Sequence, residues 1–145
     1  MAAALSPRLQ QIVEALPLAA GLRILEIGCG PGAASRAIAQ RIGTGHILGI
    51  DRSAKAIAQA AAQSAELIAS GRMSYRHVAI EDLELEPGEA RYDFAFAVRV
   101  GALDGRHPAA GLAATTRLKA VLKPGGRLFI DDGNPLREVD IGGGV

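Results

Sequence analysis

The residues best suited to ligand chemistry lie between Arg23 and Ala39, where a short apolar run leads into a glycine-rich turn. Gly28, Gly30 and Gly32 alternate through this turn, and Glu26 precedes it by two positions. Glycine lets a backbone turn sharply and leaves its N–H groups open to a ligand, because no side chain stands over them. A buried strand, a glycine turn and the start of an alanine-rich helix together predict a nucleotide-binding site.

Four ordered motifs resemble those of the class I S-adenosylmethionine-dependent methyltransferases. They are Glu-Ile-Gly-Cys-Gly-Pro-Gly at 26–32, Gly-Ile-Asp at 49–51, Tyr-Asp-Phe-Ala-Phe at 92–96 and Leu-Lys-Pro-Gly-Gly-Arg-Leu at 122–128. A single glycine pattern would be weak, whereas four signals in the family's order across residues 20–132 are specific. The resemblance implies S-adenosylmethionine as the cofactor and methyl transfer as the reaction.

The resemblance also implies which residues hold the cofactor. Asp51 would accept hydrogen bonds from both ribose hydroxyls, each contributing roughly 1.5 to 3 kcal/mol. The turn would lie along the methionine part, and Glu26 would orient its head group directly or through water. The full set of expected cofactor-binding residues is Glu26, Gly28, Cys29, Gly30, Gly32, Asp51, Arg52, Ile80, Glu81, Asp82, Val98 and Arg99.

Residues 79–83 resemble the acidic loop with which the family binds adenine. Ala79 stands where the family often carries an aspartate, so the role passes to Glu81 or Asp82. Cys29 has no paired base in its sequence context and is interpreted as a small residue that the turn tolerates, not as a nucleophile.

The stretch 97–108 follows the fourth strand, whose carboxyl end faces the transferred methyl group in this fold. It lacks Asn-Pro-Pro-Tyr, the family's signature for exocyclic amines, which leaves small-molecule and protein side-chain acceptors open. His107 is the candidate general base, with Asp104 to orient or replace it. The alternative is a turn with a solvated His107. Arg99 either binds a substrate carboxylate or pairs with a nearby acid.

The elements around these residues predict how they are positioned. Ser6 and Pro7 begin an N-terminal helix within residues 1–20. Strands are expected at 24–27, 46–51, 73–80, 92–98 and 127–131, and helices at 33–42, 53–70 and 109–122. This alternation predicts one α/β domain over 1–145, a Rossmann-like doubly wound parallel sheet of order 3-2-1-4-5 with its crevice above strands one and four.

Residues 134–145 carry no element signal and are expected to form an irregular tail. The resembled family continues with a helix and two closing strands, and this C-terminal strand pair is missing from the sequence. The fifth strand would then be an open sheet edge, which proteins normally pair or cover. A homodimer through this edge, or a covering tail, is therefore expected.

The amino-acid composition limits the classes of partner that the protein is expected to bind. The 145 residues include 16 Lys and Arg against 15 Asp and Glu, spread without a block, and there are only 3 Phe, 2 Tyr and no Trp. A nucleic-acid partner is not expected, because neither a basic face nor an aromatic stacking platform is present. With one cysteine, no predicted metal site and no apolar run near 18 residues, the sequence favours a soluble cytoplasmic protein without a membrane partner.

Two other functions fit parts of the pattern. A non-catalytic protein or partner subunit could use the same turn to bind S-adenosylmethionine or S-adenosylhomocysteine, since function depends on the site and not on the fold. An NAD-dependent oxidoreductase would use Gly28, Gly30 and Ala33 as a dinucleotide fingerprint and Asp51 for the ribose. Glu26, the 122–126 turn and the lack of a second mononucleotide half argue against the oxidoreductase.

Overall fold

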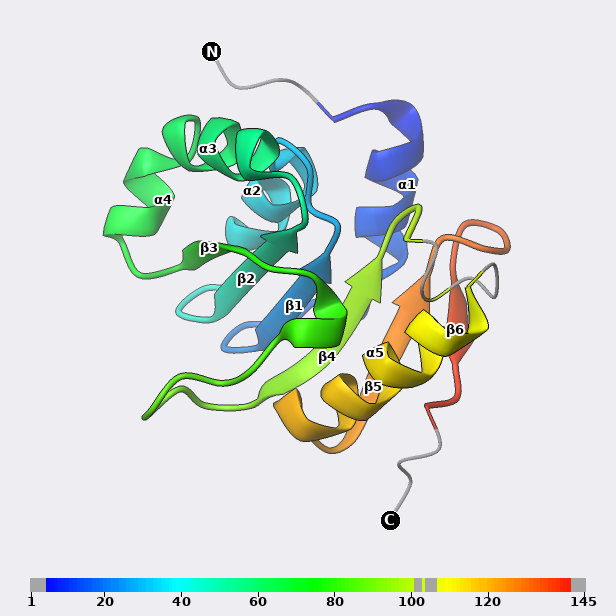
Figure 1. Cartoon of the computed structure of the whole chain (residues 1–145). Helices are drawn as coiled ribbons and strands as arrows, with labels where there is room; N and C mark the ends of the chain where they lie inside the picture. The colour runs from blue at the N-terminus through cyan, green and yellow to red at the C-terminus, as the bar shows by residue number, and fades with distance from the viewer. Residues whose placement is uncertain (1–4, 101–102, 104–106, 142–145) are drawn as a thin grey trace.

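The computed structural model describes residues 5–100, 103 and 107–141. A six-stranded sheet of order β3-β2-β1-β4-β5-β6 forms its centre (Figure 1). The strands are β1 (Arg23–Ile27), β2 (His46–Asp51), β3 (Met73–His77), β4 (Tyr92–Ala97), β5 (Leu122–Ile130) and β6 (Arg137–Val139). The first five pair in parallel, as predicted, and β6 runs antiparallel to β5.

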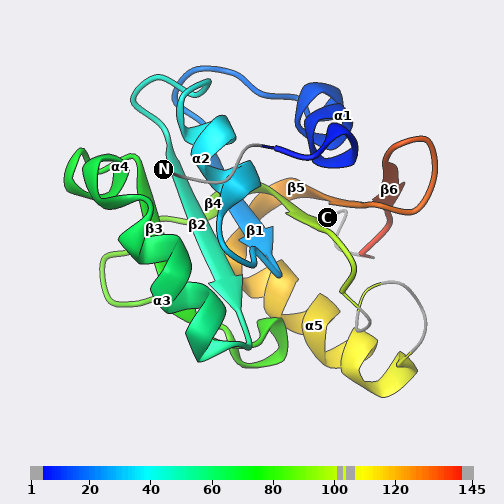
Figure 2. The same ribbon diagram turned by 90° about the horizontal axis from the view of Figure 1, so that it is seen from above.

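Helices cover both faces of the sheet (Figure 2). On one face lie α1 (Pro7–Ala15), α2 (Ala33–Ala39), α3 (Ala54–Ala62) and α4 (Ala65–Ala69). On the other lie α5 (Pro108–Val121) and the 3-10 turn η1 (Ile80–Asp82). None of the helices in the described part of the chain has the length and apolar character that crossing a bilayer requires.

Two apolar clusters, one on each face, explain the orientation of β1. Leu25 and Ile27 belong to the cluster under α5, and Ile24 belongs to the cluster under α1 and α2. Successive side chains of a strand point to opposite faces, so Glu26 shares the α2 face with Ile24. The first strand therefore carries a carboxyl group into the interior directly below the glycine turn.

The end of the chain differs from the prediction. Residues 137–139 are not an irregular tail but form β6, in which Leu128, Phe129 and Ile130 pair with Val139, Glu138 and Arg137. A three-residue strand has no periodic signal of its own; the free edge of β5 supplies its hydrogen bonds, and Arg127 pairs with Glu138 at 2.8 Å. Of the two alternatives predicted for the fifth strand, the covering tail is confirmed, because β6 pairs with β5, and the strand is not an open edge. The homodimer is no longer needed to cover this edge.

Other boundaries shift as well. The helix predicted over 33–42 ends at Ala39, and the strand predicted over 92–98 ends at Ala97. The helix expected over 53–70 is interrupted between α3 and α4, where Ser64 is buried and its hydroxyl bonds to Arg36 and Tyr75. The third strand ends at His77 before η1. The fifth begins at Leu122, because this residue pairs with Tyr92 before a bulge in the β4–β5 register admits the proline-glycine turn.

Candidate functional site

The glycine turn joins β1 to α2 in the left-handed backbone region. The φ angles are 75° at Gly28, 52° at Gly30 and 89° at Gly32, values that residues other than glycine rarely adopt. A Cβ at Gly28 would also stand 2.9 Å from Cγ2 of Val100, whereas one at Gly30 would meet no atom within 4 Å. Gly28 is thus constrained by its neighbour, and the space over Gly30 is open to a ligand.

Asp51 ties the turn to the end of β2. Its Oδ2 accepts a hydrogen bond from the Gly30 N–H at 2.8 Å, and its Oδ1 accepts one from the Ser53 N–H at 2.8 Å. A carboxylate has about four lone-pair sites, so these two bonds leave acceptor capacity for a ligand.

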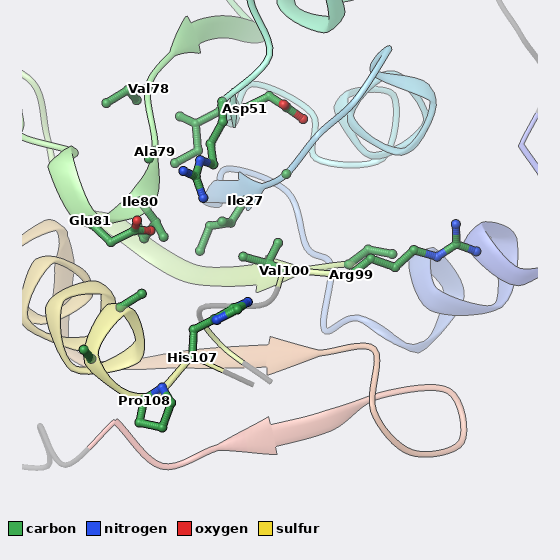
Figure 3. Close-up of a pocket in the computed structure, with 16 residues that line it drawn as sticks. Ile27, Asp51, Val78, Ala79, Ile80, Glu81, Arg99, Val100, His107 and Pro108 are labelled. Carbon is green, nitrogen blue, oxygen red and sulfur yellow. The ribbon is translucent and has the colours of Figure 1, made fainter. Parts of the chain in front are cut away.

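A pocket of about 870 Å³ opens above the carboxyl ends of β1, β2 and β4 (Figure 3). It is lined by Ile27 and Gly28 and by residues 50–52, 78–81, 98–100 and 107–110. This volume lies in the range of small-molecule and cofactor sites. In parallel sheets of this kind, ligands bind at this end of the strands.

The pocket brings together most residues predicted to bind a cofactor. Those on its wall are Gly28, Asp51, Arg52, Ile80, Glu81, Val98 and Arg99. Gly30 and Gly32 belong to the adjoining turn. Of the two acids that the sequence left as alternatives, Glu81 lines the pocket, whereas Asp82 is exposed and does not.

Glu26 lies beneath the turn and is not on the pocket wall. Its side chain is 3% exposed, and Oε1 has no hydrogen-bond partner in the described structure. Burial raises the pKa of this carboxyl to about 8 from an ordinary 4.5, and the nearby Asp51 carboxylate adds to the rise. The Ser35 hydroxyl and the Arg36 guanidinium favour the ionised form but do not offset the effect of burial.

Cys29 is also buried in the turn, and its Sγ lies 3.6 Å from the Gly30 carbonyl oxygen. Burial, together with the carboxyl groups of Glu26 and Asp51, raises the pKa of the thiol. A thiol held in its neutral form is a poor nucleophile, so the residue suits a packing role.

The pocket wall formed by residues 98–100 and 107–110, where the sequence predicts the methyl acceptor to lie, is apolar except for His107 and Arg99. The His107 ring points toward Val100, while the Arg99 side chain extends away from the other labelled residues (Figure 3). Arg99 adopts a left-handed φ of 58°, and its N–H donates to Oδ1 of Asp131 at 3.1 Å. Asp104, the predicted partner of His107, lies outside the described residues.

Sequence reasoning missed a group of polar side chains under the turn: Ser35, Arg36, Ser64 and Tyr75. These residues are up to 40 positions apart, and no local pattern links them. On the pocket wall it also missed Ile27, Ile50, Val78, Ala109 and Ala110, whereas Val100 belongs to the predicted stretch 97–108. Among the described residues, no three His, Cys, Asp or Glu side chains are placed to hold a metal ion.

The first strand of the parallel part of the sheet leads into a glycine turn, the second ends in an acid, and a pocket opens above both. These features define a Rossmann-like ligand-binding domain. The sequence profile of the Methyltransferase domain family matches residues 24–126, and the chain belongs to this family. The predicted resemblance is thereby confirmed.

Two curated relatives are named as ubiquinone biosynthesis O-methyltransferases. The protein of Xylella fastidiosa (strain 9a5c) is 40% identical over 129 residues, which cover 88% of this chain and 48% of the relative. That of Leptothrix cholodnii is 34% identical over 125 residues, which cover 85% of this chain and 49% of the relative. The chain thus spans about half the length of these relatives.

Solved structures share the fold. The [4+2]-cyclase SpnF superposes with a TM-score of 0.68 at 28% identity, over 84% of this chain and 42% of that one. Phosphoethanolamine N-methyltransferase 2 of Haemonchus contortus, solved with S-adenosyl-L-methionine, gives a TM-score of 0.66 at 25% identity, over 85% of this chain and 27% of that one.

Proposed function

We propose that this chain is an S-adenosylmethionine-dependent methyltransferase that methylates a hydroxyl group of a small molecule. The observation that carries the proposal is the link between Asp51 and the Gly30 N–H at the mouth of the pocket, which joins the expected ribose acid to the glycine turn. The choice of an oxygen acceptor is supported by relatives that are named O-methyltransferases.

The described residues fit this cofactor. Open space over Gly30 would admit the methionine part, Asp51 would accept the ribose hydroxyls, and Glu81 would accept from the adenine amine. Glu26 places a buried carboxyl with an unpartnered oxygen below the turn, near where the ammonium group would lie. The Asp51 and Glu81 carboxylates on the pocket wall offer acceptors for the cofactor's hydrogen-bond donors. The match of residues 24–126 to a methyltransferase profile disfavours NAD.

Bound S-adenosylmethionine would supply a methyl group on a sulfonium that departs as a neutral thioether. The chain's own residues would then act mainly by positioning, since alignment at near-attack distance accounts for much of such a barrier reduction. Val98, Val100 and Pro108 would keep water from the acceptor side of the pocket. His107 would accept the hydroxyl proton, with Asp104 as its predicted orienting partner.

Calorimetric titration tests the cofactor assignment. Native protein should bind S-adenosylmethionine and S-adenosylhomocysteine but not NAD, and Asp51→Ala should abolish or greatly weaken binding. Asp82→Ala is the matched control, because this acid is exposed and off the pocket wall. Absence of binding in a folded sample would refute the assignment.

Turnover then separates an enzyme from a binding protein. An acceptor screen with hydroxyl compounds should yield methylated product, and His107→Ala should lower kcat while leaving cofactor affinity intact. Binding without methyl transfer to any acceptor would favour the non-catalytic alternative. One structural neighbour is named as a cyclase, so the fold by itself does not decide the reaction.

A further inference from the structure

The floor of the glycine turn is a group of four polar side chains from three parts of the chain. Ser35 and Arg36 come from α2, Ser64 from the junction of α3 and α4, and Tyr75 from β3. Ser35 is 0% exposed, Ser64 3% and Arg36 8%. Burying a polar group without a hydrogen bond costs folding free energy. The hydrogen bonds of these four side chains are therefore expected to matter for the structure of the turn.

The four residues form a continuous hydrogen-bond circuit. Arg36 Nη1 donates to Ser64 Oγ at 3.2 Å, and the Tyr75 hydroxyl donates to Ser35 Oγ at 3.1 Å. The Ser64 and Tyr75 hydroxyls are 3.3 Å apart. Because the single Tyr75 proton goes to Ser35, Ser64 must be the donor in that contact.

Both ends of the circuit reach the glycine turn. Arg36 Nη1 also donates to the Pro31 carbonyl oxygen at 2.8 Å, and the Ser35 hydroxyl donates to the Gly32 carbonyl oxygen at 3.4 Å. A Cβ at Gly32 would collide with the Tyr75 hydroxyl and stand 2.9 Å from Arg36 Nη1. The turn therefore rests directly on the circuit, with two consecutive carbonyls held from below.

We propose that Arg36, Ser64, Tyr75 and Ser35 are positioning residues for the amino-acid end of the ligand, holding the glycine turn in its binding conformation. The inference rests on the proposed function, in which the turn faces the methionine part of the cofactor. The turn has high backbone conformational freedom, because Gly28, Gly30 and Gly32 lack side chains. The circuit restricts this freedom before a ligand binds. Preorganisation of this kind raises affinity by reducing the ordering cost of binding.

Two ligands distinguish positioning of the turn from a general packing role. S-adenosylhomocysteine carries the amino-acid end, whereas 5′-methylthioadenosine keeps the adenosine and lacks that end. Loss of the circuit should weaken the first ligand selectively, because the Asp51 and Glu81 side of the pocket is untouched. A packing defect that loosens the whole domain would weaken both ligands alike.

The decisive variant is Tyr75→Phe, which removes the hydroxyl and keeps the ring that packs against Gly49. We expect S-adenosylhomocysteine to bind roughly five- to tenfold more weakly, as the loss of one net hydrogen bond predicts, with the affinity for 5′-methylthioadenosine changed less than about twofold. Tyr92→Phe is the matched control. It removes the hydroxyl of a tyrosine on β4, which donates to Glu89 and lies away from the glycine turn. That change should leave the ratio of the two affinities unaltered.

A second variant keeps the test informative if one substitution harms folding. Ser64→Ala opens the same circuit, so it should reproduce the selective loss, and the double variant Tyr75→Phe/Ser64→Ala should lose little more than either single one. Equal weakening of both ligands, or an unchanged ratio in folded Tyr75→Phe, would overturn the inference while leaving the proposed function standing. If native protein binds neither ligand, the proposed function fails and this inference fails with it.

Discussion

Glu26 is a carboxyl group at a position where the strand pattern calls for an apolar side chain. It shares the α2 face of β1 with Ile24, and its Oε1 has no hydrogen-bond partner in the described structure. Stability is normally lost at such a position, so a buried acid there is expected to serve the site. Its protonation state should be visible in the stability of the whole domain.

Stability should fall as pH rises from about 4.5 to about 8, the ordinary and the folded pKa of Glu26. In this window the folded protein holds a proton on Glu26 that the unfolded chain has released. Raising the pH therefore favours the unfolded state. Glu26→Gln should remove the fall and be more stable than the native protein at pH 8.5, with a slope difference of at most about 1.4 kcal/mol per pH unit. Urea unfolding at several pH values measures this.

Glu66→Gln, on the exposed surface of α4, is the control for the Glu26 experiment and should follow the native curve. A native stability that stays level between pH 5 and pH 8.5, once other groups are accounted for by this control, would show that Glu26 is ionised in the folded protein.

Glu81 and Asp82 give a second comparison at the scale of single residues. They are adjacent in η1, but only Glu81 lines the pocket. Glu81→Gln should weaken S-adenosylhomocysteine and 5′-methylthioadenosine by the same factor, roughly fivefold for the loss of about 1 kcal/mol, because both carry the adenine. Asp82→Asn should weaken neither. Calorimetry with both ligands decides, and an effect of Asp82 alone would reverse the assignment.

At the scale of elements, the end of β5 holds the end of β4 and the start of α1 together. Asp131 accepts from the Arg99 N–H through its carboxylate, and its carbonyl oxygen accepts from Arg8 at 2.7 Å. Arg99 has a left-handed backbone, which costs a side-chain-bearing residue about 1 to 2 kcal/mol. The segment 98–100, which lines the pocket, is thus strained at Arg99 and held in place by Asp131.

Asp131→Ala should destabilise the domain by about 1 to 2 kcal/mol, because Arg99 loses the acceptor that stabilises its strained backbone. Arg99→Gly in the same background should recover part of the loss, since glycine adopts the same φ without strain. Asp132→Ala is the matched control, because this exposed acid pairs only with Arg137 in the described structure and should change stability by less than about 0.5 kcal/mol. Urea unfolding of the native protein and these three variants measures the changes. Equal stability of Asp131→Ala and Asp132→Ala would contradict this account.

Most elements could be predicted because each has a local signal. Ser6 and Ser53 cap their helices as expected, and the apolar runs of β1, β2 and β4 match buried parallel strands. The break at Ser64 could not be predicted, because it follows from partners 28 and 11 positions away. The strand β6 could not be predicted either, because its three residues are ordered by pairing with β5.

The same distinction applies to the site. Asp51, Glu81 and His107 line one pocket because their motifs follow strand ends that a parallel sheet gathers at one edge. The inward direction of the Glu26 side chain follows from the alternation of side chains along a strand. The direction of the Arg99 side chain and the circuit under Gly32 depend on tertiary packing, which no single motif encodes.

At the scale of the whole molecule, the sheet has two edges, and neither is a long apolar strand. At one edge β3 presents a half-buried Arg76 and an exposed His77. At the other, β6 is only three residues long and exposes Arg137 and Glu138. Short, charged edge strands discourage pairing between copies.

The chain should therefore sediment as a monomer over a wide range of concentration. Val139 is half-buried and packs on the core under α5, so Val139→Asp should detach β6 and expose the apolar edge of β5, producing self-association that grows with concentration. Glu138→Gln, which alters the exposed face of the same strand, should remain monomeric. A native dimer that Val139→Asp leaves intact would show that copies associate through some other surface, whereas a native dimer that this change abolishes would mean that β6 itself forms the contact.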